Sequence, residues 1–321
     1  MKQIDLAAAA ARLRAAAGIV ILVHQHPDGD TLGCGYALAH TLHALGKPVR
    51  VLGEDPVPAM FRYMLEGLPE TEPQPGWLVT AVDVADEHLL GPSLAARYGG
   101  RVDLCVDHHS TNTGFAAETV LDPDAAAAAE RIGELVDTLG VPLNRTIAAC
   151  LYAGISTDTG CFRYSSTTAA THRYAARYMD LGVPAAALNR AFFETKTRTY
   201  AALERLALDT LRFYCGERVA VLYVTQEMFR RSGSNEEEYV KIAPLTRQIE
   251  GVLVGVALRE RTDGTFKISL RSHEPIDAAA ICARMGGGGH ARAAGCASEA
   301  GLEASIAAIV RYTEEALAAH G

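Results

Sequence analysis

Continuous apolar runs and helically spaced apolar positions alternate along the first half of the chain. Gly18–Val23 is apolar throughout, as in a buried strand, and Leu32–Leu45 repeats apolar residues at helical spacing before Gly46. Further strands are predicted at Val49–Leu52, Trp77–Val82 and Val102–Val106. Helical spacing returns at about 125–139, 145–155 and 168–181. This alternation predicts an α/β domain with a mostly parallel sheet and helices on both faces.

A long helical stretch separates this pattern from a second, smaller one. Helical spacing continues from about Pro184 to Leu211, and we expect residues 188–212 to form a helical connector. Later strands are predicted at Val219–Val224, Val252–Leu258 and Phe266–Leu270, with a hairpin turn at 261–265. Helices are predicted at 276–285 and 302–317. We therefore expect a first domain over residues 1–187 and a smaller mixed-sheet α/β domain over residues 213–321.

Composition narrows the class of protein. The 321 residues suit about two domains. The alanine-rich stretch 6–17 contains two arginines and is too short to cross a bilayer, so we expect a surface helix, no membrane association and a cytoplasmic location. Seven cysteines without a Cys-x-x-Cys pair predict free thiols. A net charge of −8 argues against a partner such as long duplex nucleic acid, but it allows a short substrate held by local cations.

Acidic and histidine side chains follow four predicted elements of the first domain. They are His24, Asp28 and Asp30 after the first strand, Asp83 after the third, Asp107, His108 and His109 after the fourth, and Asp158, which we treat as a further strand end. Any one aspartate could simply cap a helix or form a turn. Together they should converge, because the carboxyl ends of parallel strands meet at one edge. Their mutual repulsion would be offset by a pair of divalent metals sharing a carboxylate.

A glycine-rich run marks the second domain. Gly286 to Gly289 precede His290 and Arg292, and Arg271 follows a predicted strand. Four glycines allow close backbone approach, and their N–H groups can surround an anion. The cationic side chains would add donors for a phosphate. The alternative is a flexible linker.

These motifs, in this order, resemble the DHH phosphoesterase superfamily, named for the triplet at 107–109. The segment 286–295 resembles the glycine-rich signature of the DHH-associated domain, and residues 159–165 look most like the nanoRNase/pAp-phosphatase family. The resemblance implies a catalytic first domain and a substrate-binding second domain. Cys34 departs from the serine common at that position, which is not a ligand position.

The resemblance also assigns roles to residues. One metal ion would be held by His24, Asp28 and Asp83, and the other by Asp30, Asp83, His108 and Asp158. The ions are most often Mn²⁺ in this family, with Mg²⁺ or Co²⁺ as alternatives. Asp107 would orient an imidazole, and His109 would contact the scissile phosphate or assist the leaving group. The implied substrate-binding residues are His109, Arg163, Arg271, Ser272, Gly287, Gly288, Gly289, His290 and Arg292.

The expected activity is hydrolysis of short oligoribonucleotides to mononucleotides and removal of the 3′-phosphate from 3′-phosphoadenosine 5′-phosphate. Three alternatives stay open. The first is a phosphodiesterase acting on cyclic dinucleotides or their linear products. The second is a family-II inorganic pyrophosphatase, which the glycine-rich signature disfavours. The third is a nucleotide-binding sensor without activity, which the complete set of ligand residues disfavours. The sequence also leaves open whether the chain forms a homodimer.

Overall fold

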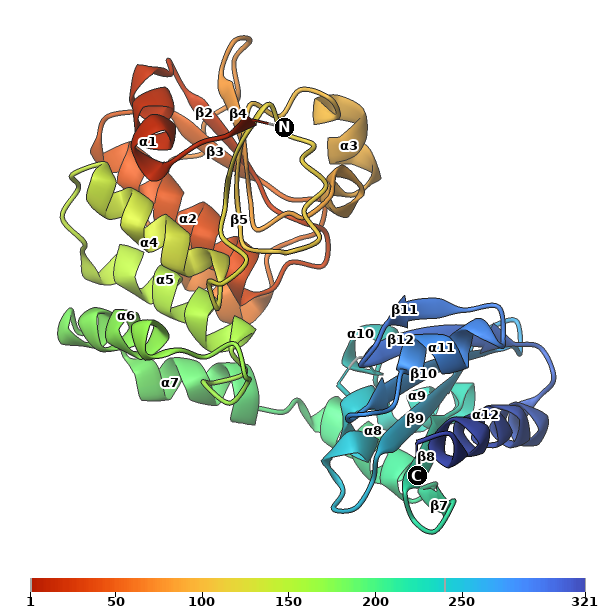
Figure 1. The fold of residues 1–321 in the computed structure, drawn as a ribbon. Helices are drawn as coiled ribbons and strands as arrows, with labels where there is room; N and C mark the ends of the chain where they lie inside the picture. Colours follow the sequence, from red (N-terminus) through yellow and green to blue (C-terminus); the bar gives the residue numbers. More distant parts are fainter. Residues whose placement is uncertain (1, 240, 321) are drawn as a thin grey trace. The chain divides into compact units, whose positions relative to one another are not determined.

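The computed structural model describes residues 2–239 and 241–320 and divides the chain into two compact units, Met1–Thr195 and Lys196–Gly321. Unit 1 is built on a sheet with strand order β1-β6-β5-β4-β2-β3, and every neighbouring pair is parallel (Figure 1). The strands are β1 (Lys2–Gln3), β2 (Ile19–Leu22), β3 (Val49–Leu52), β4 (Leu78–Val82), β5 (Leu104–Asp107) and β6 (Glu118–Leu121). The predicted parallel sheet is confirmed, and β1 and β6 extend it beyond the prediction.

Helices cover both faces of this sheet, as predicted. The helices of unit 1 are α1 (Leu6–Ala15), α2 (Gly29–Ala44), α3 (Pro92–Tyr98), α4 (Ala128–Thr138), α5 (Arg145–Asp158), α6 (Ala169–Asp180) and α7 (Ala185–Asn189), with 3₁₀ turns η1 (Ala59–Leu65) and η2 (Glu87–Leu90). One core joins α1, α2, α4 and α5 to residues such as Ile21 and Val82. Another joins α3 and η2 to Val20, Leu22 and Cys105 on the opposite face.

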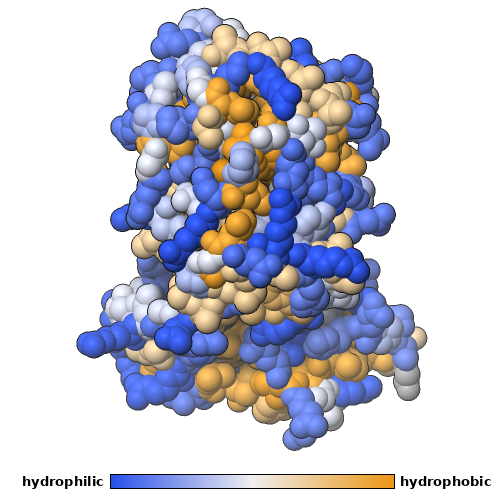
Figure 2. Space-filling view, turned by 90° about the vertical axis from the view of Figure 1, so that its left-hand side faces the viewer, coloured by the Kyte–Doolittle hydropathy of each residue, from blue (hydrophilic) through white to orange (hydrophobic). Residues whose placement is uncertain are grey.

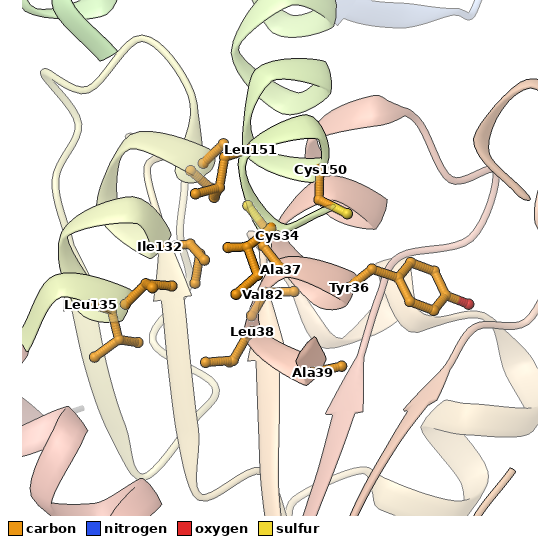
Figure 3. Close-up of a cluster of buried hydrophobic side chains, with 14 of the residues drawn as sticks. Cys34, Tyr36, Ala37, Leu38, Ala39, Val82, Ile132, Leu135, Cys150 and Leu151 are labelled. Carbon is orange, nitrogen blue, oxygen red and sulfur yellow. The ribbon is translucent and has the colours of Figure 1, made fainter. Parts of the chain in front are cut away.

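Small residues let α2 and α5 pack closely. A Cβ atom on Gly33 would lie 2.4 Å from the carbonyl oxygen of Cys150, so only glycine fits the crossing. Figure 3 shows the surrounding core, where Cys34 and Ala37 of α2 lie among Ile132 of α4, Leu151 of α5 and other apolar side chains. This close packing matters for function because α2 and α5 both carry candidate ligands.

Unit 2 has a mixed sheet, as predicted. Its strand order is β11-β12-β10-β9-β8-β7, in which β8 and β9 are parallel and the other pairs antiparallel. The strands are β7 (Arg212–Tyr214), β8 (Val219–Val224), β9 (Val254–Glu260), β10 (Phe266–Ser272), β11 (Gly288–His290) and β12 (Ala293–Ser298). The helices are α8 (Arg198–Leu208), α9 (Gln226–Ser232), α10 (Glu236–Tyr239), the 3₁₀ turn η4 (Ala243–Gln248), α11 (Ala278–Ala283) and α12 (Leu302–Ala318).

Two expectations about helical stretches need correction. The segment from Pro184 to Leu211 is not one continuous helix: α7 passes into a π-helical turn, η3 (Arg190–Glu194), and α8 begins only at Arg198. Residues 125–127 are also not helical, since α4 begins at Ala128. In both places the sequence favours a helix, through alanine at 125–127 and through apolar spacing after Pro184, but the chain turns there instead.

The face drawn in Figure 2 carries both hydrophilic and apolar side chains, with the hydrophilic ones on both sides of a central apolar strip and further apolar patches elsewhere. Within residues 2–239 and 241–320, no helix is both long enough and apolar enough to cross a membrane.

Candidate active site

The predicted ligands of unit 1 leave their elements at one end of the parallel sheet. His24 follows β2, Asp83 follows β4 directly, and His108 follows Asp107, the last residue of β5. Asp28 is the N-cap of α2, and its carboxylate accepts hydrogen bonds from the N–H groups of Asp30 and Thr31. The helix therefore begins three residues earlier than the sequence pattern predicts, and Asp30 lies in its first turn.

Asp158 does not follow a strand, so this expectation is wrong. It is the last residue of α5, a helix that continues through Gly154. A Cβ on Gly154 would lie 2.6 Å from both the Cβ of Ala129 and an oxygen of Asp30. Glycine is retained inside the helix because α2, α4 and α5 meet there, and this packing carries Asp158 to the same place as the strand-end residues.

The ligand-forming atoms gather in three overlapping groups. Within each group they all lie within 4.8 Å of one another. The groups are His24, Asp28 and Asp83; Asp30, His108 and Asp158; and Asp83, His108 and His109. All six predicted ligands are therefore brought together with His109, and Asp83 and His108 each belong to two groups.

His24 and His108 are held in the same way. The Nδ1 atom of His24 lies 2.8 Å from the carbonyl oxygen of Gln25, and that of His108 lies 3.0 Å from the carbonyl oxygen of Ala125. Because a carbonyl can only accept, Nδ1 carries the proton and Nε2 keeps its lone pair in the neutral ring. The Nε2 atom of His24 lies 3.7 Å from Asp28 and from Asp83, and that of His108 lies 3.5 Å from Asp158 and 3.6 Å from Asp83. This arrangement is typical of metal-binding histidines.

Asp83 is the centre of the cluster. Its side chain is only 3% exposed, and its Oδ1 atom is buried without a hydrogen-bond partner. Its backbone has φ +55°, a left-handed conformation that is uncommon outside glycine. Burial and the charges of Asp30, Asp28 and Asp158 raise its pKa well above the usual value. A buried, unpaired carboxylate on strained backbone is expensive unless a ligand satisfies it.

Asp30 serves the fold and the cluster together. Its carboxylate, 1% exposed, accepts hydrogen bonds from the backbone N–H groups of Ala128 and Ala129 and so caps α4, whose own N-cap residue provides no side-chain cap. Burial and the charges of Asp158 and Asp28 raise the pKa of Asp30 well above normal, although the two N–H groups oppose this. Asp158 also has a raised pKa, chiefly through burial.

Asp28 is the most exposed of the carboxylates, with 54% of its side chain accessible. Burial of the Asp28 carboxyl acts to raise its pKa. The hydrogen bond and the charge of His24, together with the N–H groups at the start of α2, have the larger effect, so the pKa of Asp28 is lowered. The pKa of His24 is raised: burial acts to lower it, and Asp28 more than compensates. The cluster is thus open to solvent on the Asp28 side.

Asp107 is fully buried and points to His109, not to the cluster centre. One of its oxygens accepts from the His109 Nδ1 atom and from the His108 backbone N–H, each at 2.8 Å. The other accepts from the Nδ2 atom of Asn112 at 2.6 Å. Burial acts to raise the pKa of Asp107, and these hydrogen bonds lower it. The hydrogen bond to Asp107 raises the pKa of His109, whose ring is 42% exposed.

Asn112 is the residue that sequence reasoning missed. Its amide also donates to the carbonyl of Val84 and its oxygen accepts from the N–H of Gly114, so it ties the loop after β5 to the loop after β4. An asparagine in an ordinary loop gives no sequence signal for such a role.

We expect Asn112→Ala to lower turnover about tenfold while leaving metal affinity nearly unchanged, because it frees Asp107 and His109 from their fixed orientation but removes no ligand. Leaving the buried Asp107 oxygen unpaired should also cost about 1–3 kcal/mol of stability. Initial rates and thermal melting test both effects. The neighbouring Thr113→Ala is the control, since that hydroxyl donates only weakly, at 3.4 Å, to the carbonyl of Ala85. Equal losses in the two variants would contradict the assigned role.

The donor set fits divalent metal ions. Carboxylates and neutral imidazole nitrogens suit hard or borderline ions such as Mn²⁺. The unpaired Asp83 oxygen and the raised pKa values of Asp30 and Asp83 identify a concentration of buried negative charge that bound cations would relieve.

Of the other predicted site residues, Arg163 belongs to unit 1 and the rest belong to unit 2. Arg163 follows α5; its Nε atom donates to the carbonyl of Gly160 at 2.5 Å, and its guanidinium lies over the ring of Phe193. In unit 2, Ser272 is buried and its hydroxyl donates to the carbonyls of Ile276 and Ala291. Arg292 also donates to the Ile276 carbonyl, at 2.5 Å.

The glycine-rich run was expected to be a loop, but part of it forms a strand of a hairpin. Gly288–His290 is the edge strand β11, paired with β12. Gly289 has φ +144°, and a Cβ on Gly287 would lie 2.2 Å from the carbonyl oxygen of Gly295. Glycine is needed here for the tight backbone approach that makes the strand pair. Arg271 and His290 lie on neighbouring parts of the same sheet.

Comparison with known proteins agrees with this architecture. The model of the DHH family N-terminal domain matches residues 18–155, and the DHHA1 domain model matches residues 216–319. The chain is 35% identical over 284 residues to the bifunctional oligoribonuclease and PAP phosphatase NrnA of Thermus thermophilus, covering 86% of this chain and 83% of that protein.

Solved structures share the fold. An exopolyphosphatase-related protein from Bacteroides fragilis superposes with a TM-score of 0.83 at 21% identity, covering 97% of this chain and 96% of that one. RecJ of Thermus thermophilus, in complex with Mn²⁺, gives a TM-score of 0.52 at 19% identity, covering 96% of this chain and 54% of that one.

Proposed function

The chain belongs to the DHH family of phosphoesterases, and from this premise we propose that it hydrolyses short oligoribonucleotides to mononucleotides and removes the 3′-phosphate of 3′-phosphoadenosine 5′-phosphate. The observation that carries the proposal is the set of three ligand groups, which are linked because Asp83 belongs to two of them and His108 to two. The relative from Thermus thermophilus, named for both activities, supports this substrate class.

Two divalent ions, most simply Mn²⁺, would occupy the cluster. His24, Asp28 and Asp83 would hold one ion, and Asp30, Asp83, His108 and Asp158 the other, with one Asp83 oxygen facing each group of ligands. When bound, such ions lower the pKa of water and offset the charge on phosphoryl oxygens. Asp30 and Asp83 are both buried, so two ions would neutralise negative charge that the fold has already removed from water.

The chain's own residues prepare the site. His24 and His108 present Nε2 lone pairs because backbone carbonyls hold their Nδ1 protons. Asp107 holds Nδ1 of His109, which leaves Nε2 of that exposed ring free to contact the scissile phosphate. Asp28 is exposed to solvent, so a substrate would approach the cluster from the Asp28 side.

Unit 2 supplies the basis for substrate recognition. Arg271, His290 and Arg292, with the backbone of the β11–β12 hairpin, would bind a phosphate or a neighbouring nucleotide. Binding the ends of nucleotide chains or short oligonucleotides requires only a few local cations and no broad basic surface. This mode of binding therefore suits a chain with a net charge of −8.

A substrate panel tests the proposal. Purified protein with Mn²⁺ is given a diribonucleotide, 3′-phosphoadenosine 5′-phosphate, linear and cyclic di-adenylate, and pyrophosphate, with chelated protein as the control. We expect mononucleotides from the linear dinucleotides and inorganic phosphate from the bisphosphate. Faster cleavage of the cyclic dinucleotide would favour the alternative phosphodiesterase, and no release from any substrate would favour a binding protein.

A further inference from the structure

Two cysteines lie together between a helix and the sheet of unit 2. Cys282 belongs to α11 and Cys296 to β12, and α11 packs on this strand (Figure 1). Both side chains are part of the core between the sheet and its helices, with Cys282 fully buried and Cys296 8% exposed. Both thiols are free. The activity proposed above uses neither of them.

Backbone contacts place the two cysteines at the start of the glycine-rich hairpin. The carbonyl oxygen of Cys282 accepts hydrogen bonds from the N–H groups of Met285 and Gly287, each at 3.0 Å. A Cβ atom on Gly287 would lie 2.5 Å from the Cβ of Cys296. The Cys296 thiol also donates to Sδ of Met285 at 3.9 Å. Gly287 therefore contacts both cysteine residues, directly before β11 begins at Gly288.

The two thiols differ in acidity. The Cys282 thiol donates a hydrogen bond to Cys296, which lowers the pKa of Cys296 although burial opposes this. The same hydrogen bond, together with burial, raises the pKa of Cys282. Burial also raises the pKa of Cys150, and burial with neighbouring carboxylates raises the pKa of Cys34. Because the thiolate is the form that reacts with oxidants, Cys296 is the more reactive thiol of the pair, and a second thiol lies beside it.

We propose that Cys282 and Cys296 are a modification site at which hydrogen peroxide forms a reversible disulfide, and that this bond weakens substrate binding by the glycine-rich hairpin. The Cys296 sulfur attacks one peroxide oxygen and the O–O bond breaks. The leaving hydroxide takes up the proton that Cys296 has lost and becomes water. The Cys282 sulfur then attacks the sulfenic sulfur of Cys296, the S–O bond breaks, and the hydroxide leaves as water with the Cys282 proton. Two thiols and one peroxide thus give one disulfide and two waters, and a thiol reductant reverses the change.

The disulfide changes the hairpin because the packing at Gly287 leaves no spare room. A sulfur–sulfur bond is about 2.0 Å long, well below the contact distance of two separate thiols, so its formation draws α11 and β12 together. Gly287 lies against Cys296 without space for even one added carbon atom, and the backbone of the hairpin must therefore move. The effect on substrate binding rests on the proposed function, in which this backbone contacts the substrate. The formation of the disulfide does not rest on it.

The test treats the full native chain, first reduced and then freed of reductant, with hydrogen peroxide. Intact mass spectrometry should show a loss of about 2 Da, the mass of two hydrogens, and peptide mapping should join Cys282 to Cys296. Dithiothreitol should restore the original mass. In Cys282→Ala, oxidation of Cys296 should stop at the sulfenic acid, which dimedone traps, because the second thiol is missing. Cys215→Ala, at a partly exposed thiol of the same unit, is the matched control and should form the disulfide as the native chain does.

Activity is measured on the same samples after the peroxide is removed. With Mn²⁺ and a diribonucleotide, the oxidised native chain should show a KM raised about tenfold with kcat little changed, since a shift of about 1 Å in a binding group can cost up to about 100-fold. Dithiothreitol should restore the KM. The KM of Cys296→Ala should be the same with and without peroxide treatment.

The outcomes separate this inference from the proposed function. An unchanged mass would overturn the disulfide, and so would a gain of oxygen without the loss of two hydrogens, which would indicate oxidation of Cys296 or Met285 alone. A disulfide that leaves the KM unchanged would overturn its effect on the hairpin. Failure of the reduced native chain to hydrolyse the diribonucleotide would contradict the proposed function, whereas the mass and the peptide map would still decide whether the disulfide forms.

Discussion

Asp83→Asn should lose more than about 100-fold of its turnover, beyond the range typical for residues that only orient metal ligands. The same variant should fold normally. Asparagine tolerates the left-handed backbone at this position, and the change removes a buried charge that Asp30, Asp28 and Asp158 oppose. We therefore expect the melting temperature of the metal-free variant to equal or exceed that of the native protein, whereas the rise on adding Mn²⁺ should be much smaller. Initial rates on a diribonucleotide and thermal melting with and without Mn²⁺ measure both effects.

Asp103→Asn is the matched control for this change. Asp103 accepts a hydrogen bond from the N–H of Val79 near the start of β4, away from the end where Asp83 lies, and an asparagine oxygen can do the same. It should keep both its activity and its stabilisation by Mn²⁺. Near-native turnover in Asp83→Asn would remove Asp83 from the bridging role, and equal effects in the two variants would indicate a general disturbance of the sheet.

Gly33→Ala should destabilise unit 1 by about 3 kcal/mol, the upper part of the usual range for overpacking. The new Cβ would lie 2.4 Å from the Cys150 carbonyl oxygen and 3.1 Å from the Gly154 backbone nitrogen. Backbone atoms cannot rotate away, so α2 and α5 must separate. For a unit of this size we expect a fall in melting temperature of roughly 6–12 °C. Activity should fall too, because Asp30 and Asp158 lie on the two displaced helices.

Gly35→Ala on the same helix separates this contact from ordinary helix effects. Its Cβ would meet only side-chain atoms, with the nearest 2.9 Å away on Val23. Side chains can adjust, and alanine favours a helix over glycine by about 0.5–1 kcal/mol. We expect a clearly smaller loss of stability than in Gly33→Ala. Similar melting temperatures for the two variants would show that the crossing of α2 and α5 can accommodate an added Cβ atom, contrary to what the packing indicates.

The sequence predicted much of the site because a simple rule of parallel sheets applied. His24, Asp83 and His108 each follow a strand, and the carboxyl ends of those strands meet. The apolar runs were long enough to identify β2, β4 and β5. The pattern could not find β1, which has only two residues, or β6, in which the polar Glu118 and Thr119 interrupt the apolar run.

Asp158 shows where this rule stops. The sequence analysis treated Asp158 as a strand end, although the apolar spacing just before it, at 145–155, already predicted a helix. Gly154 belongs to α5 because of a contact with Asp30 and Ala129, residues far away in the sequence. The same limit explains β11, where glycine disfavours a strand locally but permits the close pairing with β12. Asn112 gains its role only from neighbours that folding brings to it.

The most direct test of the account is a titration of metal-free protein with Mn²⁺, in which bound ions per chain and turnover of a diribonucleotide are measured at the same metal concentrations. The account predicts about two ions per chain, with turnover appearing as the second one binds. Full turnover with one ion, or binding of two ions that Asp83→Asn leaves unchanged, would contradict it.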